Sequence, residues 1–286
     1  MIKREKIDQQ IDKRFPGIVV RGAGDLATGI ICRLYRSGFR VVALEVEKPT
    51  VIRRTVSLAM AVLEGSCVVE GVTAQKFSDR DSLEAVLSQG HVPIAVDETG
   101  EWIYRLRPVV VIDATISKKN IGTGYRMAPI VLAAGPGYCA GRDVDAVIET
   151  KRGHYLGNVI WNGSAEENTG VPGNIEGYTW ERVIHAQNAG KIRLVHDISD
   201  EVEKGECLAY IEDVPVRAKI SGVLRGMIAE GTEVYKGMKI ADVDPRGHKE
   251  YCEYISDKAR SIAGGVMEAM LHCITETEID VGCLFR

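Results

Sequence analysis

The sequence lacks the features of membrane and disulfide-bonded secreted proteins. No run of about 18 consecutive apolar residues occurs, so no membrane partner is expected. The opening stretch, MIKREKIDQQIDKRF, is charged throughout, and we expect it to be neither a signal peptide nor an anchor. The seven cysteines form no CxxC pair, so neither a disulfide framework nor a metal site is indicated. We therefore expect a cytoplasmic protein without a bound metal.

The chain is also poor in aromatic residues and in net charge. Aromatic residues make up 6% of the sequence, and the formal net charge is -4. A nucleic-acid partner would require a clustered basic face, and single strands usually stack on aromatic side chains. We therefore expect no nucleic acid as a partner. The 286 residues exceed what one hydrophobic core usually holds, which favours more than one domain.

The first half of the sequence alternates between short apolar runs and amphipathic stretches. The predicted strands are 17–20, 40–44, 67–69, 92–96, 109–112 and 130–133, and the predicted helices are 26–36, 51–63 and 79–87, the last with Ser78 as its N-cap. Strands that alternate with helices indicate a parallel sheet covered on both faces. We predict an α/β fold with a Rossmann-like, mostly parallel sheet.

The second half is rich in short strands and turns. Strands are predicted at 144–149 and 156–161, followed by a long glycine-rich loop at 163–177. Residues 181–243 contain the phrase Val-x-Lys-Gly twice and resemble the barrel-sandwich fold of biotinyl and lipoyl carrier domains, without a lysine in the motif that is modified there. A final helix is predicted over 256–274 with Ser256 as its N-cap.

These patterns divide the chain into three parts. We predict a Rossmann-like ligand-binding domain over 15–180, a β-rich barrel-sandwich-like domain over 181–250, and a C-terminal helix and tail over 251–286. The β-rich part is expected to dock a partner or to cover the site. The sequence leaves the oligomeric state open, including a homo-oligomer.

A glycine turn between the first predicted strand and helix is the strongest candidate site. Gly22 and Gly24 allow a tight turn and a close approach of phosphate to backbone amides, and Asp25 opens the helix. Glu45 follows about 20 residues later, where an acidic residue commonly binds ribose hydroxyls. We predict that this turn binds a small phosphate-bearing ligand. The alternative is a glycine turn without a ligand.

Two later strand ends are predicted to meet the same crevice, because the carboxyl ends of neighbouring parallel strands converge. Asp113 follows one of these strands, and Gly135 and Gly137 follow the other. Asp113 either contributes a carboxylate to the ligand or caps its own turn. The three residues complete the predicted cofactor-binding set on the sheet.

The segment GPGYCAGRDVDAVIETKRGHYLG concentrates reactive side chains. Arg142 and Arg152 suit anion binding, because a guanidinium fork matches phosphate oxygens. His154 is a candidate acid or base, with a structural histidine as the alternative. Cys139 is a candidate nucleophile, with an inert buried thiol as the alternative. Cys139 and His154 are the catalytic candidates.

The chain resembles the accessory (maturation) proteins of selenium-dependent molybdenum hydroxylases. The resemblance rests on the phrases VRGAGDLATGI, ALEVEKPTVIRRTVS, GPGYCAGRDVDAVIETKRGHYLG, NTGVPGNIEG, ISGVLRG and DVDPRG. The first half is also distantly similar to xanthine dehydrogenase accessory factors. The resemblance implies maturation of a molybdenum hydroxylase client, with a molybdopterin-type cofactor or its terminal sulfur or selenium as the cargo.

Two other functions remain open at the level of sequence. An NAD(P)-dependent oxidoreductase would use the same crevice for NAD(P), although no tyrosine–lysine pair stands at catalytic spacing. A non-catalytic adaptor would use the β-rich part to dock the hydroxylase. Whether the chain catalyses any reaction is left undecided.

Overall fold

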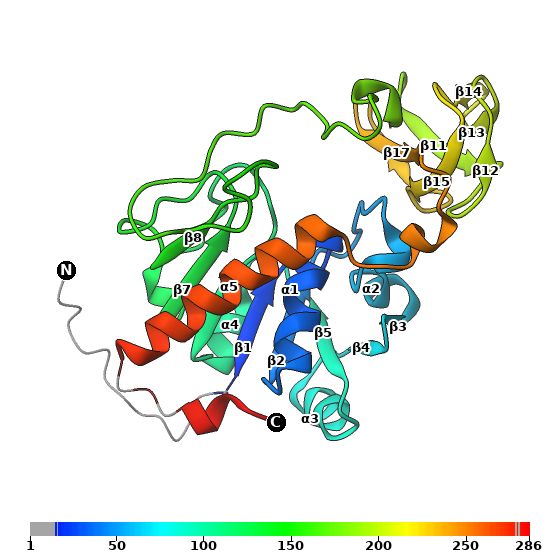
Figure 1. Cartoon of the computed structure of the whole chain (residues 1–286). Helices are drawn as coiled ribbons and strands as arrows, with labels where there is room; N and C mark the ends of the chain where they lie inside the picture. The colour runs from blue at the N-terminus through cyan, green and yellow to red at the C-terminus, as the bar shows by residue number, and fades with distance from the viewer. Residues whose placement is uncertain (1–14, 16, 278, 280) are drawn as a thin grey trace.

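A nine-stranded sheet forms the centre of the molecule (Figure 1). The computed structural model describes residues 15, 17–277, 279 and 281–286. The strand order is β3-β4-β5-β2-β1-β6-β7-β8-β9, and only the β3–β4 and β8–β9 pairs at its two edges are antiparallel among the described strands. The strands are β1 (Ile18–Arg21), β2 (Val41–Glu45), β3 (Ser66–Val69), β4 (Val72–Lys76), β5 (Val92–Val96), β6 (Val110–Asp113), β7 (Ile130–Ala134), β8 (Ala146–Ile148) and β9 (Val159–Ile160).

The six central strands have the order of a Rossmann sheet. In chain order they are β1, β2, β5, β6, β7 and β8, and in space they lie as β5-β2-β1-β6-β7-β8. This is the 3-2-1-4-5-6 order of dinucleotide-binding folds, in which ligands bind where the order reverses. The reversal lies between β1 and β6, so the turn after β1 stands at that point. The predicted α/β fold with a mostly parallel sheet is confirmed.

Helices cover both faces of this sheet, and each face has its own hydrophobic core. The helices are α1 (Asp25–Arg36), α2 (Met60–Glu64), α3 (Arg80–Ser88), α4 (Glu101–Leu106) and α5 (Asp257–Thr275). Ile18 and Val20 point to the core under α1, α2 and α5, whereas Val19 points to the core under α3 and α4. Burial on both faces explains why the strands read as continuous apolar runs.

The long helix α5 lies beside α1 and completes one face of the sheet (Figure 1). Ser256 caps it by accepting a hydrogen bond from the Ala259 N–H, as predicted. Small residues allow α5 to approach both α1, through Gly29 and Ala259, and the segment that contains Gly157. A Cβ atom on Gly265 would lie 2.1 Å from the Gly157 carbonyl oxygen, whereas a Cβ on Gly264 would meet no atom within 4 Å.

We predict opposite effects for two adjacent substitutions in α5. Gly265→Ala should lower the free energy of unfolding by about 1–3 kcal/mol, because the added methyl group displaces the backbone at Gly157. Gly264→Ala is the matched control and should raise it by up to about 1 kcal/mol through helix propensity. Urea unfolding followed by circular dichroism measures both. Equal stabilities for the two variants would contradict this packing.

A second lobe consists of two four-stranded antiparallel sheets with their own core (Figure 1). One sheet has the order β10-β17-β15-β12 and the other β14-β13-β11-β16. The strands are β10 (Val183–His185), β11 (Gly190–Leu194), β12 (Glu201–Val202), β13 (Cys207–Ile211), β14 (Val214–Arg217), β15 (Gly222–Met227), β16 (Glu233–Val234) and β17 (Lys239–Asp244). The many short strands predicted over 181–243 are therefore present.

The repeated Val-x-Lys-Gly phrase corresponds to a structural repeat in this lobe. The first copy forms β12, a turn at Gly205, and β13; the second forms β16, a turn at Gly237, and β17. Both glycines have positive φ angles, of 92° and 88°. Each copy begins in one sheet and ends in the other, and the two copies do so in opposite directions. Each copy thus links the two layers.

The helix predicted over 51–63 is wrong as a single element. Only the 3-10 turn Arg54–Val56 and the short α2 form there. The Leu58 N–H donates to the Thr28 hydroxyl at 2.9 Å, and the Ala59 N–H donates to the Ala23 carbonyl at 2.8 Å. These amides bind the start of α1 instead of a preceding turn of their own helix. Tertiary hydrogen bonds therefore override the local helical pattern.

Smaller differences concern the ends of elements and two short elements that were not predicted. Asp79, and not Ser78, is the N-cap of α3, because its carboxylate accepts from the Ser82 N–H at 2.8 Å. Strand β4 and helix α4 were missed, and β8 is three residues long where six were expected. The predicted charged arm at residues 1–14 lies outside the described residues.

Within the described part of the chain, no helix is long and apolar enough to cross a membrane.

Candidate functional site

The glycine turn after β1 packs against the end of β6. Gly22 has a φ of +92°, and a Cβ there would lie 3.0 Å from the Ala114 carbonyl oxygen. The close contact between the glycine turn and the segment at Ala114 therefore requires glycine at position 22, whether or not a ligand binds there. Gly24 is the N-cap of α1, and a Cβ there would meet a Val51 methyl group first, at 3.5 Å. A Cβ atom on Gly24 would thus make an ordinary van der Waals contact, so packing alone does not require glycine at this position.

Glu45 lies at the end of β2, as expected, but its carboxylate binds the chain itself. One oxygen accepts from the Ala23 N–H and the other from the Val46 N–H, both at 2.8 Å. Burial raises the pKa of Glu45, and the two backbone hydrogen bonds oppose that rise. Glu45 therefore holds the glycine turn against β2.

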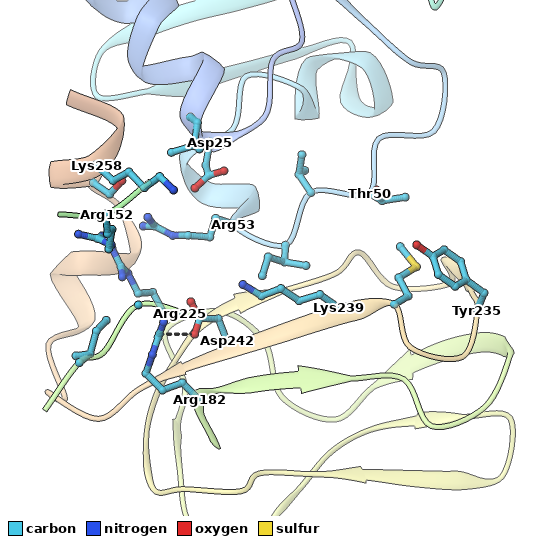
Figure 2. A pocket seen from close by; sticks show the side chains of 17 residues that line it. Asp25, Thr50, Arg53, Arg152, Arg182, Arg225, Tyr235, Lys239, Asp242 and Lys258 are labelled. Atoms are coloured by element: carbon cyan, nitrogen blue, oxygen red, sulfur yellow. Dashed lines mark hydrogen bonds and ion pairs between the residues drawn. The ribbon is translucent and has the colours of Figure 1, made fainter. Parts of the chain in front are cut away.

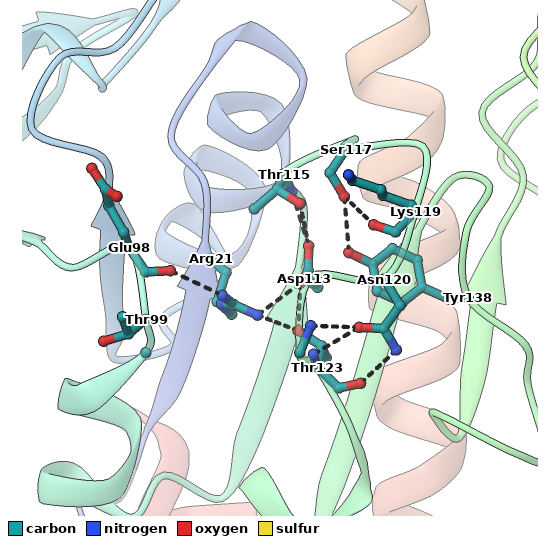
Figure 3. A network of polar contacts seen from close by, with 12 residues as sticks. Arg21, Glu98, Thr99, Asp113, Thr115, Ser117, Lys119, Asn120, Thr123 and Tyr138 are labelled. Carbon is teal, nitrogen blue, oxygen red and sulfur yellow. Dashed lines mark hydrogen bonds and ion pairs between the residues drawn. The ribbon is translucent and has the colours of Figure 1, made fainter.

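Asp113 is the centre of a buried polar network below the turn (Figure 3). Its side chain is fully buried and accepts from the Arg21 guanidinium at 3.2 Å. It also accepts from the Thr115 N–H at 3.1 Å, the Thr115 hydroxyl at 2.7 Å, and the Thr123 hydroxyl. Arg21 donates in addition to the Glu98 carbonyl at 3.3 Å. Both carboxylate oxygens are thus occupied by protein donors, which agrees with the turn-capping interpretation.

The other glycines and reactive residues predicted after β7 have local partners. A Cβ on Gly137 would lie 2.5 Å from the Lys119 Cα, and one on Gly135 would lie 3.0 Å from the Thr150 hydroxyl oxygen. Cys139 donates its N–H to Asp143, and the exposed Arg142 binds the same carboxylate at 3.0 Å. The two glycines therefore serve packing between loops.

His154 is exposed and packs edge-to-face on Tyr155, with ring centroids 5.2 Å apart. Cys139, Arg142 and His154 line neither of the two cavities that the described chain forms around Arg152. The structure therefore does not bring the two catalytic candidates to the glycine turn. In the described part of the chain, no group of three or more histidine, cysteine, aspartate or glutamate residues is placed to hold a metal ion.

A cavity of about 480 Å³ lies between the N-terminus of α1, the start of α5 and the β-rich lobe (Figure 2). We call it the cationic cavity. Six of its lining side chains are basic: Arg53, Arg152, Arg182, Arg225, Lys239 and Lys258. Two are carboxylates, Asp25 and Asp242. The β-rich lobe therefore supplies part of the wall of this cavity.

Three arginines in this cavity are more than nine-tenths buried and incompletely paired. Arg53, Arg182 and Arg225 are 7%, 6% and 9% exposed, and the Nε of each has no hydrogen-bond partner among the described residues. Arg182 binds Asp242 at 2.6 Å, and Arg225 lies 3.5 Å from Asp244. Buried charged donors normally find partners, so these unmet donors leave the positive charge of the three side chains incompletely balanced within the protein.

The electrostatics of the cavity favour an anion. Burial lowers the pKa of Arg53, and the nearby positive charge of Arg225 lowers it further. Burial likewise lowers the pKa of Lys258, with a further contribution from Arg152. The N-terminus of α1 adds a partial positive charge at Asp25. A bound anion would therefore offset both the burial of these charged side chains and the repulsion between them.

Arg152 is held in place by Asp257 at the first position of α5. Its two terminal nitrogens lie 2.8 and 3.0 Å from the two carboxylate oxygens. These hydrogen bonds lower the pKa of Asp257 to about 2. Such a bidentate pair fixes the plane of the guanidinium. Arg152 is thus positioned before any ligand binds.

Of the predicted site residues, Asp25 and Arg152 line the cationic cavity, and Gly24 precedes Asp25 as the N-cap of α1. Sequence reasoning missed the remaining basic residues: Arg53, Arg182, Arg225, Lys239 and Lys258. A signal was present for two of them. Arg53 stands in VIRRTVS and Arg225 in ISGVLRG, two of the phrases that carry the family resemblance.

Comparison with known proteins gives one homologue and only weak structural likenesses. No protein-family model matches the sequence. The chain is 48% identical over 254 residues to a protein of Escherichia coli K12 named "Uncharacterized protein YqeB", and the match covers 89% of this chain and 47% of that protein. The two are homologous, and this chain spans about half the length of its relative.

Solved structures resemble the chain only at low scores. An aspartoacylase family protein from Mesorhizobium loti has a TM-score of 0.27 at 12% identity, covering 80% of this chain and 84% of that one. The product-bound ectoine utilization protein EutE (DoeB) from Ruegeria pomeroyi has a TM-score of 0.22 at 13% identity, covering 71% and 57%. Scores at this level carry no argument about the present chain.

Proposed function

We propose that this chain binds a phosphate-bearing ligand in the cationic cavity, as an accessory factor in the maturation of a selenium-dependent molybdenum hydroxylase. One observation carries the binding proposal: six basic residues and only two carboxylates line one cavity at the N-terminus of α1. The ligand would be a molybdopterin-type cofactor or a nucleotide. The client hydroxylase would be the protein partner.

Phosphate is the ligand group that fits this donor set best. Guanidinium forks donate pairs of hydrogen bonds to phosphate oxygens, and a helix N-terminus supplies further donors and a positive potential. Several cations around one cavity suit a group with more than one negative charge. The two resident carboxylates, Asp25 and Asp242, leave a clear excess of positive charge.

The maturation role is supported by where the resemblance phrases lie. Arg53 comes from VIRRTVS, Arg152 from ETKRGHYLG, Gly173 from NTGVPGNIEG and Arg225 from ISGVLRG, and all four line the cationic cavity. Phrases that are separated by more than a hundred residues therefore contribute to one place. A binding cavity shared with the resembling proteins would account for that convergence, and cargo binding would then be the shared task.

An NAD(P)-dependent oxidoreductase is the second candidate, favoured by the Rossmann strand order. It would place a dinucleotide across the same edge of the sheet. The two candidates differ in the ligand they prefer, so one binding experiment separates them.

The test of ligand binding is a thermal-shift series on the full chain. The ligands are pyrophosphate, NAD, NADP, ATP, CTP, GTP and molybdopterin nucleotides. A ligand at a hundredfold excess over its Kd stabilises the native state by about 2.7 kcal/mol, so we expect a clear rise in Tm with pyrophosphate and with pterin nucleotides. The rise should shrink at high salt. A shift with NAD or NADP alone would favour the oxidoreductase, and no shift with any phosphate ligand would refute the binding proposal.

The maturation role has its own test in cells. Deleting the gene should leave the hydroxylase polypeptide present but inactive. Hydroxylase activity and polypeptide amount are measured in the same extracts. Normal activity in the deletion strain would contradict the proposal.

A further inference from the structure

A second cavity, of about 560 Å³, adjoins the cationic cavity beneath the loop at 163–177. We call it the loop cavity. The two cavities share three lining residues, Arg152, Gly173 and Lys258. Each volume lies in the range of small-molecule sites. The shared residues show that the two cavities are neighbours with a common boundary.

The walls of the loop cavity differ from those of the cationic cavity. Uncharged polar side chains come from Asn168, Thr169 and Asn174, and apolar side chains from Ile116, Val171 and the prolines 136 and 172. Its charged lining residues carry both signs, with Lys118, Lys151, Arg152 and Lys258 against Glu166 and Glu167, and Lys151 is paired with Glu166. Amide and hydroxyl groups next to apolar surface suit the edge and face of a heterocycle better than a phosphate.

The loop cavity has a fixed base. Glu149 is 4% exposed, and one of its oxygens accepts from the N–H groups of Thr150 and Lys151, both at 2.7 Å. The other oxygen accepts from the Glu166 N–H at 2.8 Å. This carboxylate therefore ties the start of the loop to the end of β8. The floor of the cavity is set before a ligand enters.

The boundary between the cavities is basic. Arg152 is fixed by Asp257, whereas the ammonium group of Lys258 has no hydrogen bond or ion pair among the described residues. A Cβ on Gly173 would lie 2.8 Å from the Arg152 Cδ, so a larger residue would displace the arginine side chain. Two cations thus stand where a ligand would pass from one cavity to the other.

We propose that the two cavities hold one extended ligand, a hydrogen-bonding heterocycle joined to a diphosphate. The diphosphate lies in the cationic cavity, the heterocycle lies under the loop, and Arg152 and Lys258 contact the link between them. This inference rests on the proposed binding function and adds the class of ligand. It also assigns a role to the glycine-rich loop, which covers the heterocycle.

The test compares short and extended probes by titration calorimetry on the full chain. The probes are inorganic pyrophosphate, GDP, CDP and a molybdopterin nucleotide. We expect at least one extended probe to bind tenfold or more tightly than pyrophosphate. Arg225→Gln should weaken all probes, because it removes a cation from the shared diphosphate site.

A loop variant separates the two ends of the ligand. In Asn168→Ser/Asn174→Ser, the serine hydroxyls can still accept the loop hydrogen bonds that now run from the N–H groups of Gly170 and Gly177. The side-chain amide donors of these two lining residues are lost. The Kd of the double variant for pyrophosphate should lie within twofold of the wild-type value. Its Kd for the extended probe should rise about tenfold.

The outcomes distinguish this inference from the function on which it rests. Absence of pyrophosphate binding would overturn the proposed function, and this inference with it. Pyrophosphate binding with equal affinity for all extended probes, or with no effect of the double variant on them, would overturn the extended ligand alone. The binding of a phosphate in the cationic cavity would then stand.

Discussion

Arg225→Gln is expected to abolish most of the affinity for pyrophosphate without lowering the stability of the ligand-free protein. A hydrogen bond to a charged group contributes about 1.5–3 kcal/mol, which corresponds to roughly a 10- to 150-fold rise in Kd. Removing this charge also removes a repulsion from Arg53, because burial and the positive charge of Arg225 both lower the pKa of Arg53. We therefore expect the Tm of the ligand-free variant to be equal to or higher than that of the wild type.

Asp244 does not lose its counterion in this variant. Arg246 binds it at 2.6 Å, whereas Arg225 lies 3.5 Å from it. Arg217→Gln is a matched control, because Arg217 is an exposed arginine of the same lobe that does not line the cationic cavity. Calorimetry and thermal unfolding are run on both variants. Unchanged affinity in Arg225→Gln, or equal losses in the two variants, would contradict the assigned site.

Asp113→Ala is expected to produce the largest loss of stability, about 3–5 kcal/mol. The substitution leaves the guanidinium of Arg21 buried without a counterion and removes the acceptor of the Thr115 and Thr123 hydroxyls. Urea unfolding of the full chain, without ligand, measures the effect. A loss below about 1 kcal/mol would show that the network contributes little.

A second variant separates the orphaned charge from the missing contacts. In Arg21→Met/Asp113→Leu, both charges are replaced by apolar side chains of similar size. Replacing a buried ion pair in this way is often neutral or stabilising, so the double variant should recover much of the lost stability. If it is as unstable as Asp113→Ala, the hydroxyl contacts of Asp113, and not its charge pairing, support the turn.

The sequence predicts those parts of the fold that depend on local pattern. The strand–turn–helix unit of β1 and α1 is recognised from a buried apolar run, a glycine turn and helical spacing, and α5 from its serine cap and apolar stripe. The segment after β2 is different. The amides of Leu58 and Ala59 bind partners in α1 and in the glycine turn, and no local pattern reveals those partners.

The candidate site is harder to predict because it is assembled from distant segments. Arg53, Arg152, Arg225 and Lys258 meet only after the β-rich lobe and α5 have packed on the sheet. The sequence alone does not tell that Arg225 lines the candidate site and Arg142 does not. The structure does, since the side chain of Arg142 is 72% exposed and bound to the adjacent Asp143, whereas Arg225 is buried.

The place of α5 in the chain imposes an order on folding during synthesis. Its partner α1 ends at Arg36, and α5 begins at Asp257, so more than two hundred residues are translated between them. At about 5–20 residues per second this takes on the order of 10–40 s, and the apolar face beside α1 stays uncovered throughout. The β-rich lobe, whose strands all lie between Val183 and Asp244, can condense on its own core earlier. The nascent chain is therefore most vulnerable to aggregation just before α5 emerges, and the cationic cavity, which Ser256 and Lys258 help to line, is completed last.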